Sequence, residues 1–134
     1  MQDGVPEGFI DPRIGGFVGD LGPVYRHDCD GHVRSGFFVR QAHCNPADIC
    51  HGGWLSTFAD VSLVRQAGLT ASPLVTISLA VDFLDAVQIG EWVESRCEIV
   101  RRTNSMVFAQ GTAHAKGRAV LRMNGIFRIL RPQG

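Results

Sequence analysis

A single carboxylate interrupts the most apolar helical stretch of the sequence. From Trp54 to Ala67 the residues are almost all apolar or small, and they are apolar nearly all round a helix, which is typical of a buried helix. Asp60 lies inside this run. The nearest charged side chain, Arg65, is five positions further on and cannot form the usual pair between residues three or four apart. Because a buried carboxylate without a partner costs free energy, we expect Asp60 to have a chemical role. The alternative is a structural carboxylate that caps backbone groups or meets an arginine from another element.

Two glycines stand where this helix is predicted to begin. Gly52 and Gly53 follow His51, and the loop before them starts at Asn45. A helix N-terminus offers free N–H groups and the positive end of the helix dipole, and glycine lets a ligand approach the backbone closely. These N–H groups could donate to an oxygen that becomes negative in a reaction. The glycines could equally serve close helix–sheet packing, His51 could cap the helix, and Asn45 could start a turn.

A sheet must hold this helix in place. In residues 74–84 apolar side chains alternate strictly with small or polar ones, which predicts a strand with Val75, Ile77 and the following odd-numbered residues on one face and Thr76 on the other. The same reasoning predicts further strands at residues 24–29, 33–41, 92–101, 106–115 and 119–130. Tight turns join the last four strands, so these strands are predicted to run antiparallel. A helix that is apolar around its circumference requires a curved sheet around it.

Length and composition narrow the class of protein. The 134 residues suit one domain, and the 13 Lys and Arg residues balance 13 Asp and Glu residues, which gives no electrostatic footprint for nucleic acid or an anionic membrane. Neutral charge with many apolar residues suggests a surface covered by another subunit. No apolar run is long enough to span a bilayer, and the N-terminus lacks the basic and apolar regions of a signal peptide. We therefore expect a cytoplasmic protein with reduced thiols.

The chain divides into two unequal parts. Residues 1–23 are rich in glycine and proline and are expected to form an arm or short helical lead-in, whereas residues 24–134 are expected to form a single domain. Several histidines and cysteines crowd into residues 27–51, but their spacing does not give the two close ligand pairs that zinc sites usually show. We therefore expect no metal.

The sequence resembles the hotdog-fold thioesterases, in particular the branch with the phenylacetate-pathway and 4-hydroxybenzoyl-CoA thioesterases. The resemblance rests on Asn45, the triplet His51-Gly52-Gly53, Asp60 at the family spacing, and the strand order over residues 24–130. It implies an α+β hotdog fold, in which a curved antiparallel sheet of about five to six strands wraps one long central helix. It also implies a homodimer with the active site at the subunit interface, and association of dimers into a homotetramer.

The resemblance further implies an acyl-CoA thioesterase that hydrolyses a small or medium acyl- or aroyl-CoA to the free acid and CoA. CoA is part of the substrate, and no cofactor is expected. Asp60 would be the general base or the nucleophile, acting on substrate held by the other subunit, and Gly52 and Gly53 would polarise the thioester carbonyl. Relatives often carry glycine in place of Asp48 and an aliphatic residue in place of Cys50, so substrate preference does not transfer.

Three further side chains take roles from the resemblance. Asn45 would contact the thioester or orient water, His51 would hydrogen-bond near the thioester, and Thr76 would help to place water near the carboxylate. Without the resemblance, Thr76 is an ordinary strand threonine. The acyl pocket is expected to have its walls at Trp54, Phe58, Phe83 and Leu84.

The CoA phosphates are expected to bind near turns between the later strands, through cations and turn amides. The candidates are Arg101, Arg102, Asn104, Ser105, Lys116 and Gly117. Such residues are otherwise solvated turn residues.

Two other functions fit the same fold. A module that binds acyl-CoA without turnover is the alternative to the enzyme, although the presence of Asp60 and Asn45 argues against it. A hydratase or dehydratase acting on an acyl thioester is a weaker third hypothesis, because those enzymes pair a histidine with a carboxylate in a different arrangement.

Overall fold

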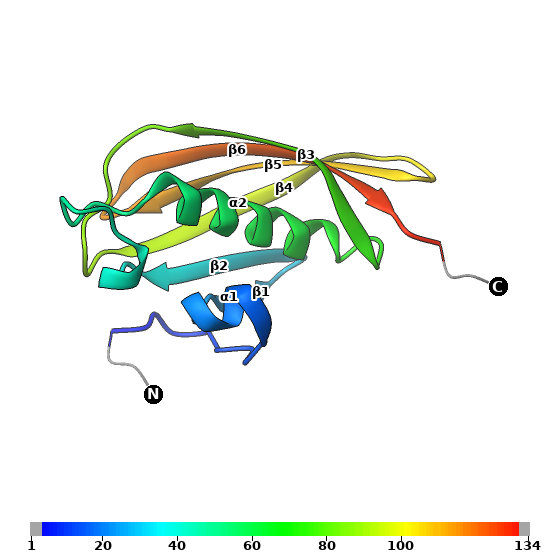
Figure 1. The fold of residues 1–134 in the computed structure, drawn as a ribbon. Helices are drawn as coiled ribbons and strands as arrows, with labels where there is room; N and C mark the ends of the chain where they lie inside the picture. Colours follow the sequence, from blue (N-terminus) through cyan, green and yellow to red (C-terminus); the bar gives the residue numbers. More distant parts are fainter. Residues whose placement is uncertain (1–3, 132–134) are drawn as a thin grey trace.

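A single antiparallel sheet curves around one long helix in the computed structural model, which describes residues 4–131 (Figure 1). The sheet has six strands in the order β1-β2-β4-β5-β6-β3, and each neighbouring pair is antiparallel. Their bounds are β1 Tyr25–Cys29, β2 His32–Phe38, β3 Leu74–Phe83, β4 Trp92–Arg102, β5 Met106–Ala115 and β6 Arg118–Ile129. The predicted α+β hotdog architecture is confirmed.

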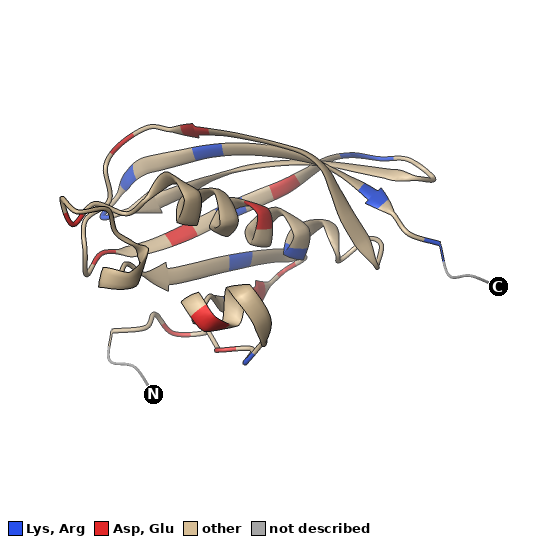
Figure 2. Ribbon diagram, viewed as in Figure 1, with Lys and Arg blue, Asp and Glu red and all other residues tan. Residues whose placement is uncertain are grey.

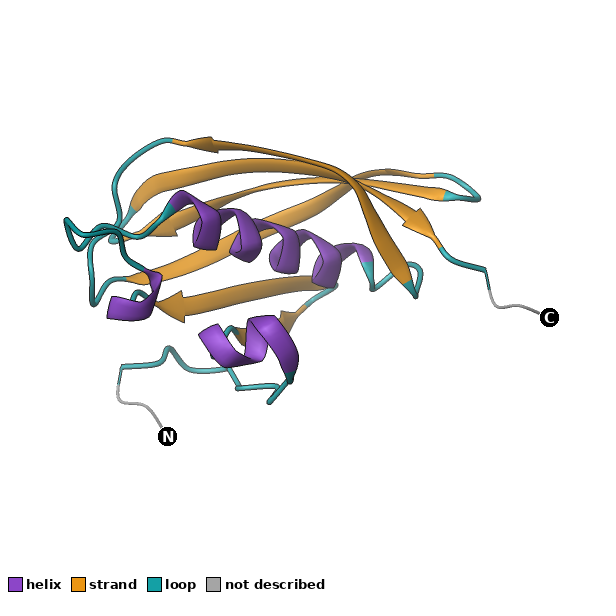
Figure 3. Ribbon diagram, in the orientation of Figure 1, coloured by secondary structure: helices purple, strands orange, loops and turns teal. Residues whose placement is uncertain are grey.

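The long helix α2, Gly52–Ala67, lies across one face of the sheet (Figure 3). Phe58 and Leu63 are fully buried there, against Phe37 of β2 and Phe127 of β6 among others. The composition of the helix suggested burial all round, but in the structure the helix is buried on one side only. The sheet covers one side, and a stripe that includes Asp60 and Val64 stays half-buried in the single chain.

A β-bulge in β3 corrects the predicted alternation of that strand. The pairing with β6 shifts between Thr76 and Ser78, so that Ile77 is an extra residue without a direct partner. Leu79 and Val81 pack against the core as predicted, but before the bulge the faces are exchanged. Val75 and Ile77 are 43% and 53% exposed, while Thr76 points to the helix. The bulge thereby brings a hydroxyl to the helix side of an edge strand.

The N-terminal arm packs beside the start of the sheet. It contains the short helix α1, Gly16–Leu21, and one bridge from Ile10 to Arg26 of β1. Strand β2 ends at Phe38, earlier than predicted, and a 3-10 turn η1, Gln41–His43, leads into the loop before α2. Among the described residues, no helix is long and apolar enough to cross a membrane.

Candidate active site

The structure joins Asp60 and Thr76, which are 16 positions apart in the sequence. The Thr76 hydroxyl donates to Asp60 Oδ1 at 2.7 Å, and both residues are half-buried. Asp60 is on the side of α2 that faces β3, and the bulge turns Thr76 towards it. Arg65 donates instead to the carbonyls of Val24 and Tyr25, both at 3.0 Å. Within residues 4–131 Asp60 therefore hydrogen-bonds a neutral hydroxyl and forms no ion pair with an arginine.

The two glycines at the start of α2 differ in what their N–H groups contact. His51 is the N-cap residue, and its Nδ1 accepts from the Gly53 N–H at 2.8 Å. A neutral imidazole that accepts at Nδ1 carries its proton at Nε2. No acceptor for the Gly52 N–H is found in the described part of the chain. The free donors at this helix end are thus the Gly52 N–H and His51 Nε2–H, whereas the Gly53 N–H is occupied by its cap.

Phe83 covers the backbone of Gly52. A Cβ placed on Gly52 would lie 3.1 Å from Phe83 Cζ, so any larger residue would require the exposed ring to shift by a few tenths of an ångström. Phe83 is 53% exposed and ends β3. Its role as a wall of the acyl pocket stays a prediction, but Phe58 does not suit that role. The Phe58 ring is fully buried, 4.8 Å from the Phe37 ring centroid, and belongs to the core.

Asn45 shapes the loop before the helix. Its Oδ1 accepts from the N–H groups of Ala47 at 2.9 Å and Ile49 at 3.2 Å, so the turn function is realised. The side-chain amide NH2 has no acceptor among the described residues and is free to donate. Asp48 has φ 60°, a left-handed conformation that favours glycine and that aspartate tolerates. The backbone therefore explains how Asp48 can stand where relatives often have glycine.

The residues expected to bind CoA do not come together in one chain. The turn with Asn104 and Ser105 joins β4 to β5, and the turn with Lys116 and Gly117 joins β5 to β6. The two turns are at opposite ends of β5, about 30 Å apart by strand geometry (Figure 2). Only the turn at Lys116 lies at the end of the sheet where α2 begins, because β6 pairs there with Phe83.

An ion-pair network in which only Glu91 is buried links residues at that end of the sheet. Arg118 contacts Glu91 and Asp85, with a distance of 2.8 Å in each pair. The hydrogen bond from Arg118 lowers the pKa of Glu91 to about 2. Arg118 is therefore committed to the fold, and Lys116 is the cation of this turn that remains available to a ligand.

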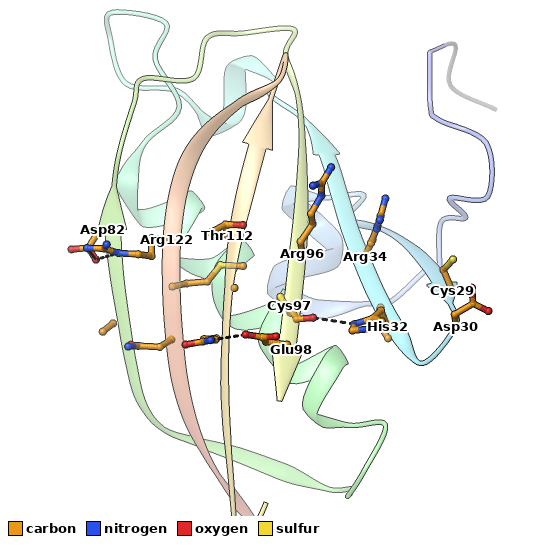
Figure 4. A pocket seen from close by; sticks show the side chains of 16 residues that line it. Cys29, Asp30, His32, Arg34, Asp82, Arg96, Cys97, Glu98, Thr112 and Arg122 are labelled. Carbon is orange, nitrogen blue, oxygen red and sulfur yellow. Dashed lines mark hydrogen bonds and ion pairs between the residues drawn. The ribbon is translucent and has the colours of Figure 1, made fainter. Parts of the chain in front are cut away.

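A large cavity of the sheet lies apart from these residues. Its volume is about 780 Å³, and it is on the face of the sheet away from α2 (Figure 4). Its lining includes Arg96, Thr112 and Arg122, whose sequence neighbours Ala113 and Leu121 are buried on the helix side. Neither Asp60 nor the start of α2 lines this cavity. No group of three or more histidine, cysteine, aspartate or glutamate side chains is placed to hold a metal ion within residues 4–131.

Comparison with known proteins places the chain in a family. Residues 47–121 match the family model described as the thioesterase superfamily. The chain belongs to the thioesterase superfamily. The family match indicates a thioester hydrolase, and the matched region contains the His51-Gly52-Gly53 triplet, Asp60 and Thr76.

A relative and two solved structures extend this family match. A protein of Pseudomonas aeruginosa, named provisionally as an esterase, is 32% identical over 130 residues, which cover 93% of this chain and 97% of that protein. The Asn-to-Asp mutant of the phenylacetic acid degradation protein PaaI from Thermus thermophilus has a TM-score of 0.77 at 23% identity, covering 84% of this chain and 97% of that one. A protein of Bacillus halodurans solved with CoA has a TM-score of 0.80 at 18% identity, covering 90% and 83%. These two structures share the fold of this chain.

Proposed function

We propose that the protein is an acyl-CoA thioesterase whose active site is completed by a second copy of the chain. The observation that carries the proposal is the separation of its chemical groups. Asp60 is eight residues after Gly52 on one straight helix, about 12 Å along the axis. A base and an oxyanion donor must lie within about 3 Å of the same reacting group. The Asp60 and the Gly52 of one chain therefore belong to different active sites.

The open edge of the sheet supplies the means of association. Strand β3 is an edge strand, and it exposes Val75, Ile77 and Phe83. If two copies of β3 pair antiparallel about a two-fold axis at Ala80, with Ile77 again the extra residue of the bulge, Thr76 of one copy lies opposite Phe83 of the other. This pairing brings Asp60 of one subunit to the Gly52 end of its partner. Exposed apolar side chains on a long edge strand favour such an interface.

In this site the helix end holds the thioester and the carboxylate activates the attack. The Gly52 N–H and His51 Nε2–H donate to the carbonyl oxygen as it becomes negative, and one such donor typically contributes about 3 to 4 kcal/mol to the barrier reduction. Asp60 of the second copy accepts a proton from water, whose oxygen bonds to the acyl carbon. The bond from carbon to sulfur breaks, and CoA leaves as the thiol with the proton returned to sulfur. Attack by Asp60 itself, through an anhydride that water then hydrolyses, gives the same products.

The remaining parts of the proposal concern the substrate and the assembly. The substrate class is a small or medium acyl- or aroyl-CoA, and the Bacillus halodurans relative solved with CoA supports a CoA thioester. Lys116 of one subunit, with Arg101 and Arg102 of another, are the candidates for the phosphates. We also propose that two such dimers form a homotetramer, whose molar mass light scattering measures directly. The proposed location is the cytoplasm.

The test compares Asp60→Asn with Asp30→Asn, a control at an exposed position in the turn between β1 and β2. Thiol release from a panel of CoA thioesters should fall by about 100-fold or more in Asp60→Asn and stay near wild type in the control. Unchanged hydrolysis by folded, oligomeric Asp60→Asn contradicts the mechanism. Tight acyl-CoA binding by wild-type protein without thiol release favours the non-catalytic binding module instead.

Subunit mixing tests the shared site. Asp60→Asn and His51→Ala each disable both sites of a homodimer, but a mixed dimer keeps one site with both residues intact. Random mixing should therefore restore about a quarter of wild-type activity. If the two residues act within one chain, mixed dimers contain no intact site and mixing restores nothing.

A further inference from the structure

A small pocket lies between the N-terminal arm and the start of α2. Its volume is about 270 Å³, and its lining includes Phe17 and Leu21 of α1, Cys44 of the loop, and His51, Trp54 and Thr57 at the start of α2. Gly53 also borders it. The pocket is thus next to Gly52, whose N–H is the free donor for the thioester carbonyl, because His51 and Gly53 are its two chain neighbours.

Specific hydrogen bonds hold α1 against this pocket. The Leu21 carbonyl, at the end of α1, accepts from Arg40 Nη2 at 2.7 Å and from His43 Nε2. The His43 ring in turn stacks on Trp54, with ring centroids 4.5 Å apart and planes 2° from parallel. The chain of contacts from α1 through His43 to Trp54 fixes the arm as one wall of the pocket.

Phe17 is the exposed part of that wall. The side chain is 63% exposed, although it is a large aromatic on a six-residue helix. Exposed aromatic rings at the mouth of a cavity commonly serve ligand contact. Helix α1 lies outside residues 47–121, the region that matches the family model, so this wall comes from a part of the chain that the family model does not cover.

We propose that this pocket receives the acyl group of the substrate and that Phe17 sets the acyl size that the enzyme accepts. This inference rests on the acyl-CoA thioesterase function proposed above. A carbonyl oxygen at the Gly52 N–H places the acyl carbon chain beside His51 and Gly53, at the pocket mouth. The volume corresponds to roughly nine water molecules and is below the range usual for drug-sized ligands. It fits a short acyl chain or one aromatic ring, and a long fatty acyl chain exceeds it.

The test changes the wall in both directions. Phe17→Ala should enlarge the pocket, and Phe17→Trp should reduce it. Because Phe17 is exposed, neither change is expected to unfold the protein. Ile14→Ala is the matched control, since Ile14 lies on the same arm but lines a different cavity with Asp11 and Pro23.

We would measure kcat/KM for acetyl-, butanoyl-, octanoyl-, dodecanoyl-, benzoyl- and phenylacetyl-CoA. Phe17→Trp should lower octanoyl relative to acetyl hydrolysis by about 10-fold or more, and Phe17→Ala should raise the larger substrates relative to acetyl by a similar factor. Ile14→Ala should keep the wild-type ratios. If both Phe17 variants keep these ratios, or change every substrate by one factor, the pocket assignment is wrong while hydrolysis itself still supports the thioesterase.

Binding separates this inference from the proposed function. Calorimetric titration of the same acyl-CoAs into Asp60→Asn, with and without the Phe17 changes, measures the size preference without turnover. If no thioester is hydrolysed but the order of affinities still moves with Phe17, the pocket stands and the thioesterase proposal fails. If affinity does not depend on Phe17, the pocket assignment is overturned.

Discussion

Replacing Thr76 with valine removes the hydrogen bond to the Asp60 carboxylate and keeps the shape of the side chain. The bond is 2.7 Å long and its acceptor is a carboxylate. Hydrogen bonds to charged groups contribute about 1.5 to 3 kcal/mol. If this bond orients Asp60 in the transition state, its loss should lower kcat by about 10- to 150-fold. Thr76→Ser keeps the hydroxyl and should retain most of the activity.

The assay is thiol release over a range of acyl-CoA concentrations. Thr76 contacts the carboxylate, so kcat should fall while KM changes little. Valine is a good strand residue and Thr76 is only half-buried, so thermal unfolding should be near that of the wild type. If folded Thr76→Val has kcat within about twofold of the wild type, the contact between Thr76 and Asp60 is structural only and does not position the carboxylate.

Two further predictions concern the helix start and the end of the sheet. His51→Ala should lose both the cap on the Gly53 N–H and the Nε2–H donor, and should lower the free energy of unfolding by about 1 kcal/mol. His51→Asn should restore the cap but not the activity. Urea unfolding measures the cap and thiol release measures the activity, and full activity in His51→Asn would exclude the ring as a donor. Arg118 lowers the pKa of Glu91 to about 2 in the folded state, so the stabilisation is present above the unfolded pKa near 4.5 and is lost as the pH falls towards 2. Glu91→Gln should lose about 1 to 3 kcal/mol at pH 7 and flatten the fall in stability between pH 5 and 2 in denaturant titrations, and an unchanged pH profile would show that this ion pair does not stabilise the fold.

The sequence predicted the elements that depend on local signals. The apolar run at Trp54–Ala67 gave the position of α2, and the dipeptide Asp30-Gly31 is typical of the two-residue turn that joins β1 to β2. In the structure Asp30 and Gly31 have φ 49° and 79°, as a two-residue hairpin turn requires. Val33 and Phe37 share the buried face of β2 as the period-two pattern predicts. These features need only information from residues close together in the sequence.

Side-chain orientation and the placement of distant residues were beyond such local patterns. Whether the Gly53 N–H is free depends on the tautomer and orientation of His51, which spacing does not determine. The position of Gly52 and Gly53 at a helix start suggested both as donors, and the structure separates them. Likewise, the residues predicted to bind CoA are all cationic or turn-forming residues, but the direction of the strands places Asn104 and Lys116 at opposite ends of the sheet.

The bulge in β3 shows why the alternation pattern failed next to the candidate site. Val75 and Ile77 are apolar, as inward residues are, so a period-two pattern continues through the bulge without a break. In the single chain both are exposed, beside the half-buried stripe of α2 that contains Asp60. In the proposed dimer the second copy covers this surface, and the same apolar residues become interior. On that proposal the sequence pattern reflects burial in the assembly, and Asp60, which the pattern suggested to be fully buried, reaches that environment only when the second subunit is present.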